Sequence, residues 1–196
     1  DVAKAAIIEV GLQIGDIALD IGGNDRTLLS YYPADVLRVN MDPYSSETQG
    51  RGQGITITDY FTAAKYRKVL GKHKARLVTS IAMFYDVEDP HSFVKDIRKV
   101  LEPDGVWICQ MNSLEALVQN TAYDFIGHEH VALYSTQVFA ALVATHGLQV
   151  YKVEHNDVNG GSARFYVQHM GGPHQVQPIQ GEPHNLSGFA QRVRER

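Results

Sequence analysis

The feature that most constrains the fold is a repeated alternation of short apolar segments with longer segments of helical periodicity. Runs such as IALDI at 17–21 are typical of buried strands, whereas 90–101 places its apolar residues at helical spacing. Such alternation predicts a mostly parallel sheet that helices cover on both faces. The pattern predicts strands at 17–21, 36–42, 55–58, 75–83, 105–111, 148–155 and 162–169, and helices at 2–12, 26–32, 61–70, 90–101 and 136–146.

The last two strands differ from the others because no helix separates them. The segment 156–161 reads NDVNGG, and its turn-forming residues predict an antiparallel hairpin. The expected fold class is therefore α/β, a Rossmann-like, doubly wound, mostly parallel seven-stranded sheet with a terminal antiparallel hairpin. We expect residues 1–170 to form this domain and 171–196 to be a linker that leads to a short helix at 189–196.

Composition excludes several classes of partner. The chain has 196 residues with 18 Lys and Arg against 22 Asp and Glu and no basic run, so we expect no binding to nucleic acid. No apolar stretch approaches the roughly 18–20 residues of a membrane helix, and the first segment is amphipathic, so we expect no membrane contact and a cytoplasmic location. Cys109 is the single cysteine, which excludes a disulfide within the chain and predicts a buried thiol.

The turn after the first predicted strand is the strongest sign of a ligand site. Asp20 ends this strand, and Gly22, Gly23 and Asn24 follow it at the edge of the sheet where α/β proteins bind ligands. A dinucleotide site would normally have G-x-G-x-x-G, and this turn lacks the later glycines. Carboxylates here would instead suit a ligand that carries an ammonium and a sulfonium. The predicted cofactor is S-adenosylmethionine.

Two further acidic positions fit this cofactor. Asp42 follows Asp20 at close to the ≈20-residue separation at which a carboxylate accepts hydrogen bonds from ribose hydroxyls. Asp59 and the aromatic residues after it follow the third strand, from which a carboxylate can reach an adenine amino group while an aromatic ring covers the base. Plain structural roles for these strand ends remain open alternatives.

The segment 123–130, YDFIGHEH, gathers ionisable side chains just past the fifth strand. We interpret His128, Glu129 and His130 as candidates for general acid–base catalysis, because the ordinary pKa of histidine, roughly 6.5, lies near the operating pH. A metal site is not predicted, since H-x-H lacks the spacing of H-E-x-x-H and no third ligand is evident. Structural hydrogen bonding by these side chains is the remaining alternative.

Taken together, these stretches resemble the sugar C-methyltransferases, which are class I S-adenosylmethionine-dependent enzymes. The resemblance covers most of residues 1–170, and its specificity lies in the combination of GGND with HEH and NGGSxRxYV. The matching stretches are LDIGGNDRTLL, VNMDPYSS, ITITDYF, TSIAMFYDVEDPHSFVKDIRKVLEPDGVWICQM, YDFIGHEHVALYS and HGLQVYKVEHNDVNGGSARFYVQH.

The resemblance implies roles for individual residues. Gly22, Gly23 and Asn24 would cradle the methionine part of the cofactor, Asp42 would hold its ribose, and Asp59, Phe61 and Met83 would lie near its adenine. His130 would remove the proton next to the ketone of a nucleotide-linked deoxysugar, and Glu129 would orient the substrate or the base. The resulting enolate carbon would attack the sulfonium methyl group.

The chain departs from the family in two ways, and both keep alternatives open. Gly127 stands where family members often have a tyrosine whose hydroxyl could assist the keto oxygen. The family's cysteine-rich zinc module and C-terminal lobe are not in this sequence, so we expect a central methyltransferase module with missing flanking domains or with homo-oligomeric partners. The alternatives are an O- or N-methyltransferase acting on another small molecule, a catalytically inactive cofactor-binding module and, least favoured, an NAD-dependent dehydrogenase.

Overall fold

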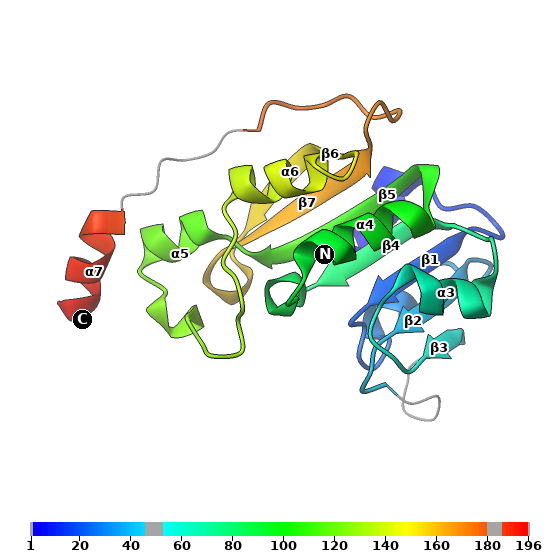
Figure 1. Ribbon diagram of the computed structural model, residues 1–196, viewed down its shortest axis with the longest axis horizontal. Helices are drawn as coiled ribbons and strands as arrows, with labels where there is room; N and C mark the ends of the chain where they lie inside the picture. Colours follow the sequence, from blue (N-terminus) through cyan, green and yellow to red (C-terminus); the bar gives the residue numbers. More distant parts are fainter. Residues whose placement is uncertain (1, 46–52, 180–185, 196) are drawn as a thin grey trace.

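The computed structural model describes residues 2–45, 53–179 and 186–195. Its centre is a seven-stranded sheet with the order β3-β2-β1-β4-β5-β7-β6 (Figure 1). β1 to β5 are parallel, and β7 runs antiparallel to both β5 and β6. The predicted α/β fold with a terminal hairpin is therefore confirmed. The strands are β1 (Ile17–Ile21), β2 (Leu37–Met41), β3 (Ile55–Ile57), β4 (Ala75–Ile81), β5 (Leu101–Asn112), β6 (Leu148–Asn156) and β7 (Ser162–His169).

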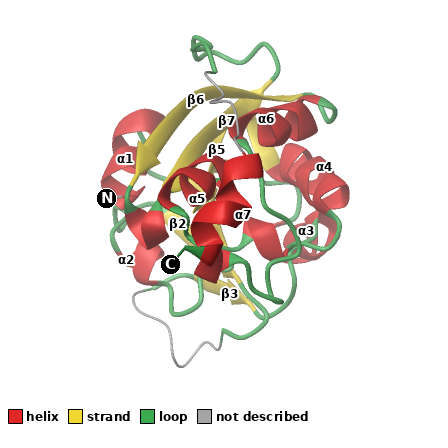
Figure 2. Cartoon of the chain, turned by 90° about the vertical axis from the view of Figure 1, so that its left-hand side faces the viewer, coloured by secondary structure: helices red, strands yellow, loops and turns green. Residues whose placement is uncertain are grey.

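Helices cover both faces of this sheet and bury a separate apolar core on each (Figure 2). The helices α1 (Val2–Val10) and α2 (Thr27–Ser30) pack on one face. The other face carries the larger core under α3 (Ala63–Leu70), α4 (Pro90–Val100) and α6 (Thr136–Ala144). Both cores exclude water from the strands, which is what a doubly wound parallel sheet requires.

Side-chain caps set the beginning of the helices on the larger core. Thr62, Asp89 and Ser135 each accept a hydrogen bond from the backbone N–H three residues further on, at 3.2, 3.0 and 3.2 Å. Each cap satisfies one of the N–H groups that the first helical turn leaves without a partner. This explains why α3 begins at Ala63, after its predicted start at residue 61.

The strand β5 begins at Leu101 and not at the predicted residue 105, so residues 103–105 lie inside it. The register of β5 against β4 shifts here, between the pairs Ala75–Leu101 and Leu77–Val106. A β-carbon on Gly105 would lie only 3.0 Å from the carbonyl oxygen of Ala75, so glycine permits the two strands to approach. The turn-forming residues therefore mark an irregularity in a strand that is longer than predicted.

Two helices lie at the carboxyl edge of the sheet, which faces the viewer in Figure 2. The helix α5 (Leu114–Asn120) was not predicted, and α7 (Leu186–Arg194) begins before the predicted 189. Arg192 on α7 donates hydrogen bonds to the Val118 carbonyl oxygen at 2.6 Å and to Thr121 Oγ1 at 3.1 Å. Part of the predicted linker, 180–185, lies outside the described residues, as does Arg196.

The connection between β6 and β7 is fastened to this same edge. Asn112 Nδ2 donates to the Asn159 carbonyl oxygen and Asn120 Nδ2 to that of Gly160, both at 2.8 Å. The Ser113 N–H donates to the Gly161 carbonyl oxygen at 3.2 Å. The predicted hairpin loop is thus a well-anchored element beside the end of β5.

Candidate active site

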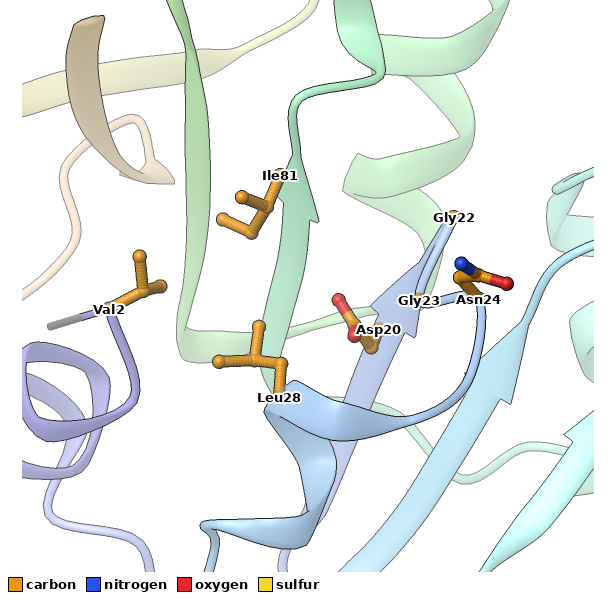
Figure 3. A pocket seen from close by; sticks show the side chains of 7 residues that line it. All are labelled: Val2, Asp20, Gly22, Gly23, Asn24, Leu28 and Ile81. Atoms are coloured by element: carbon orange, nitrogen blue, oxygen red, sulfur yellow. The ribbon is translucent and has the colours of Figure 1, made fainter. Parts of the chain in front are cut away.

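The carboxyl end of β1 opens into a cavity of about 180 Å³. Figure 3 shows the carboxylate of Asp20 pointing toward Leu28 and Ile81, while the Asn24 side chain points away from them. The predicted turn residues therefore line one hollow, although Asn24 lines it without directing its amide into it. The lining residues are Val2, Asp20, Gly22, Gly23, Asn24, Leu28 and Ile81.

Side chains of neighbouring strands and of Met83 pack tightly against the glycine turn. Gly22 has a φ of +74°, and a β-carbon there would come within 3.1 Å of Met83 Cγ. A β-carbon on Gly23 would overlap Asn40 Oδ1 and Asp20 Oδ2. Glycine is required at Gly23 because polar side chains occupy the space that any other side chain would need.

Asp20 is the most perturbed carboxyl group of this site. It is 2% exposed and accepts a hydrogen bond from Thr79 Oγ1 at 2.6 Å. Burial, together with the nearby charge of Asp42, raises the pKa of Asp20 to about 7 against the opposing effect of the Thr79 hydrogen bond. A cation bound in the cavity would favour the ionised carboxylate.

Asp42 connects the second strand to the glycine turn. Its Oδ2 accepts from the Asn24 N–H at 3.0 Å, and its Oδ1 accepts from the Tyr44 N–H at 2.7 Å. Each carboxylate oxygen has a further lone pair, so these backbone bonds orient the group and leave it able to accept from a ligand hydroxyl.

The predicted adenine contacts make their hydrogen bonds and ring contacts with different neighbours. Asp59 pairs with Lys65 Nζ at 2.5 Å, and this hydrogen bond lowers the pKa of Asp59. Phe61 packs edge-on against Phe93, with 5.2 Å between ring centroids. The residue of this group that contacts the glycine turn is Met83.

The structure adds candidates that the sequence analysis did not name. The exposed rings of Tyr44 and Tyr60 lie next to Asp42 and Asp59, with 3.4 Å between their hydroxyl oxygens. Thr79 and Asn40 are fully buried polar residues near the carboxyl ends of β4 and β2. A polar residue near the carboxyl end of a buried strand was the available signal for both.

His130 is held in one orientation by its neighbours. Its ring lies 4.5 Å from the Tyr85 ring and 4.1 Å from the Phe125 ring, measured between centroids. Its Nδ1 is 2.6 Å from the Phe125 carbonyl oxygen. Because a carbonyl only accepts, Nδ1 carries the proton in this bond and Nε2 is left with a lone pair when the ring is neutral.

The other two residues of the HEH segment extend into solvent. The side chains of His128 and Glu129 are 95% and 81% exposed, and His128 Nε2 lies 4.0 Å from Glu129 Oε1. Asp86 lies near His130 and Glu129: burial raises the pKa of Asp86, the charge of His130 lowers it, and that of Glu129 raises it. Of the three predicted residues, the structure fixes His130 most firmly.

Within residues 2–45, 53–179 and 186–195 there is no group of three or more His, Cys, Asp or Glu side chains that could hold a metal ion. No helix in these same ranges is long and apolar enough to cross a bilayer.

Comparisons with known proteins identify the family of this chain. The sequence model of the family described as "Methyltransferase domain" matches residues 9–153. The C-methyltransferase NovU of Streptomyces niveus is 30% identical over 178 residues, which are 88% of this chain and 42% of that protein. The chain therefore spans less than half the length of this curated relative.

Solved structures support the fold at much lower sequence identity. The Burkholderia thailandensis 1,6-didemethyltoxoflavin-N1-methyltransferase, solved with S-adenosylhomocysteine, gives a TM-score of 0.65 at 8% identity, with 85% of this chain and 76% of that chain covered. The cyclopropane synthase MmaA2 of Mycobacterium tuberculosis gives 0.62 at 13%, with 84% and 82% covered. A methyltransferase of Haloferax volcanii, solved with the activator Trm112, gives 0.63 at 15%, with 85% and 88% covered.

The family match extends over most of the sheet, and the strand order agrees with the fold predicted from the sequence. The chain belongs to the methyltransferase domain family.

Proposed function

We propose that this chain transfers a methyl group from S-adenosylmethionine to a carbon next to the keto group of a nucleotide-linked deoxysugar. The resemblance to sugar C-methyltransferases and the identity to a C-methyltransferase support carbon as the acceptor atom. The observation that carries the proposal is the fixed orientation of His130, whose Nδ1 is bound to a backbone carbonyl and whose Nε2 is free to take a proton. Removing a proton from carbon requires such a base, whereas methylation of oxygen or nitrogen requires it less.

The residues at the end of β1 fit the cofactor. Asp20 offers a buried carboxylate for an ammonium group, and the glycine turn offers the close backbone approach that a β-carbon would block. The cavity is smaller than the roughly 300–1,000 Å³ of typical ligand sites, so we assign it to the methionine part. We assign the ribose to Asp42 and the adenine to the region of Asp59, with Phe61 and Met83 as ring contacts. The bound cofactor would supply an electrophilic methyl group on its sulfonium.

The protein's part in the reaction is to move one proton. His130 Nε2 takes the proton from the carbon next to the ketone; the electron pair of that C–H bond forms the carbon–carbon double bond of an enolate, and the π pair of the carbonyl moves to the keto oxygen. The bound cofactor would supply its methyl group to the enolate carbon, with the electron pair of the methyl–sulfur bond leaving on sulfur, and the carbonyl would form again. The Phe125 carbonyl stabilises the protonated imidazole because Nδ1 remains a donor throughout. We assign Glu129 to orienting the substrate. His128, which is exposed beside Glu129, is assigned to the same role.

The first test separates cofactor binding from proton removal. Calorimetry with S-adenosylmethionine, with NAD as a control ligand, measures binding to the wild type, Asp42→Ala and His130→Ala. We expect binding to the wild type and to His130→Ala, weaker binding to Asp42→Ala, and no NAD signal. Turnover is then measured on a panel of nucleotide-linked ketodeoxysugars.

Hydrogen exchange at the acceptor carbon tests the base itself. In D₂O with S-adenosylhomocysteine bound, the wild type should exchange the proton next to the ketone, and His130→Ala should slow this by about 10²–10⁴-fold, the usual contribution of a general base. His73→Ala, which alters an exposed histidine after α3, is the matched control. Equal exchange in all three proteins would contradict the assignment of His130. Binding without turnover on any ketosugar would favour an inactive cofactor-binding module.

A further inference from the structure

The half of the sheet beyond β4 carries a buried polar residue that the proposed reaction does not yet use. Gln110 on β5 is 5% exposed and stands in register with Ile81 on β4 and with Arg164 on β7. Residues paired in this way point to the same face of a sheet. Since Ile81 lines the cofactor cavity, Gln110 is the next side chain along the sheet from that cavity.

The two ends of the Gln110 amide are used differently. Its Oε1 accepts from Arg164 Nε at 2.8 Å and from Asn156 Nδ2 at 3.5 Å. Both partners lie on the β7–β6 side, so the carbonyl end of the amide is directed away from the cavity. The Nε2 group makes no hydrogen bond to any residue in the described part of the chain, which leaves two N–H donors at the cavity side of the residue.

A chain of charged contacts fixes this orientation. Arg164 is 8% exposed, and its Nη1 lies 3.3 Å from Glu154 Oε2. Glu154 also accepts from the Tyr166 hydroxyl at 2.6 Å and pairs with Lys152 at 2.8 Å. A guanidinium has donors only, so it can bind Gln110 only through the amide oxygen. The network therefore prevents the amide from rotating its oxygen toward the cavity.

We propose, on the basis of the proposed function, that Gln110 Nε2 donates a hydrogen bond to the keto oxygen of the methyl acceptor. This oxygen gains negative charge when the proton leaves the neighbouring carbon, and a fixed donor in a site shielded from water stabilises such charge strongly. Gln110 thereby supplies a hydrogen-bond donor in place of the tyrosine hydroxyl that the related family often has at the position of Gly127. Arg164 is a positioning residue, since it acts by orienting the amide.

The substitution Gln110→Glu tests this directly, because a carboxylate keeps the acceptor for Arg164 and removes the donor for the substrate. The matched control is Gln168→Glu, which places the same charge at a buried glutamine on β7. Gln168 bonds the backbone of His174 and not Arg164. Calorimetry measures S-adenosylmethionine affinity, thermal denaturation measures stability, and turnover is measured on the ketosugar panel.

We expect Gln110→Glu to bind S-adenosylmethionine within a few-fold of the wild type and to lose about 10²-fold in kcat, the usual effect of removing one such donor. Gln168→Glu should lose stability and keep its kcat. Turnover by Gln110→Glu at the wild-type rate, or equal loss in both variants, would overturn the role of Gln110 alone. A wild type that turns over no ketosugar would instead overturn the proposed function and the substrate assigned to Gln110 with it.

Discussion

At the scale of single residues, Asp20 shows how burial sets the protonation of a carboxyl group in the proposed cofactor site. Its carboxyl group is enclosed by the glycine turn and Thr79, and the nearby charge of Asp42 adds to the effect of burial. With its pKa near 7, the group is largely protonated in the ligand-free protein below neutral pH. Binding of an ammonium group would reverse this balance, since a cation stabilises the carboxylate.

Asp20 therefore makes stability depend on pH in a defined direction. The pKa is raised above the unfolded value of 3.8 to about 7, so the folded chain holds a proton that the unfolded chain loses first. The contribution of Asp20 to the free energy of unfolding is fully present below about pH 4, falls as the pH rises toward 7, and is constant above. Urea denaturation measured from pH 4 to 8 gives the free energy of unfolding at each pH. We expect Asp20→Asn to reduce its dependence on pH.

A second measurement connects the same group to the ligand. Binding of S-adenosylmethionine at pH 6 should release protons from the wild type, and calorimetry in two buffers of different ionisation enthalpy detects them. Asp20→Asn should release none. Identical proton release by both proteins would show that another group titrates.

At the scale of elements, one carboxylate links the carboxyl edge to the larger core. Glu115 on α5 accepts from the Thr136 N–H, at the start of α6, at 2.8 Å and from the Ser113 hydroxyl at 2.9 Å. The negative charge also lies at the N-terminus of α6, where the helix dipole favours it. Glu115 thus holds the unpredicted helix α5 to an element of the core.

Removing this carboxylate should loosen the edge without altering the sheet. We expect Glu115→Ala to lower the free energy of unfolding by about 1–3 kcal/mol, since a backbone donor loses a charged acceptor. Chemical denaturation measures this loss, and hydrogen exchange should rise in α5 and in the first turn of α6. Glu88→Ala, at an exposed position, serves as the comparison, and an equal loss there would argue against the link.

The elements that the sequence predicted well are those whose signal is local. The apolar runs located each strand of the described sheet, and the helical spacing of the apolar residues from residue 90 located α4. The helix α5 was missed because it has only seven residues and its amphipathic pattern is short. The start of β5 was predicted too late because the proline and glycine at 103 and 105 act on the register of two strands that are distant in sequence.

The same distinction separates the site residues. The glycine turn lies within one short segment, so its place at the end of β1 was foreseeable. The contact of Asp20 with Thr79 and that of Gln110 with Arg164 join separate strands, and only the strand order brings them together. For His130, the sequence indicated the residue type, but the tautomer depends on the fold of 123–130.

At the scale of the whole molecule, the accessibility of the Cys109 thiol depends on whether the sheet is folded. It lies at the centre of β5 with no exposed surface, and burial raises its pKa to about 12 against the effect of a hydrogen bond with Ser80. A thiol in this state is neither ionised nor accessible. Its chemistry therefore depends on opening of the larger core.

We expect the thiol to react with a disulfide reagent such as Ellman's reagent only through unfolding. Labelling of the native protein at pH 8 should be slower by orders of magnitude than labelling in guanidinium chloride, where the reaction should be immediate. Added S-adenosylmethionine should slow it further, because a ligand that binds only the folded state lowers the population of open forms. Rapid labelling without denaturant would contradict the buried position of Cys109.

The position of β7 between β5 and β6 has a consequence for how the chain is made. A ribosome releases residues in order, so β1 to β5 can pair among themselves while the chain is still growing. β6 emerges before the only strand that borders it in this sheet, and it stays outside until Ser162–His169 follows. The turn at Gly22 and Gly23 can thus form early, whereas Gln110 can meet Arg164 only after β7 has been made, so the half of the sheet that we propose contacts the methyl acceptor is the last that can form.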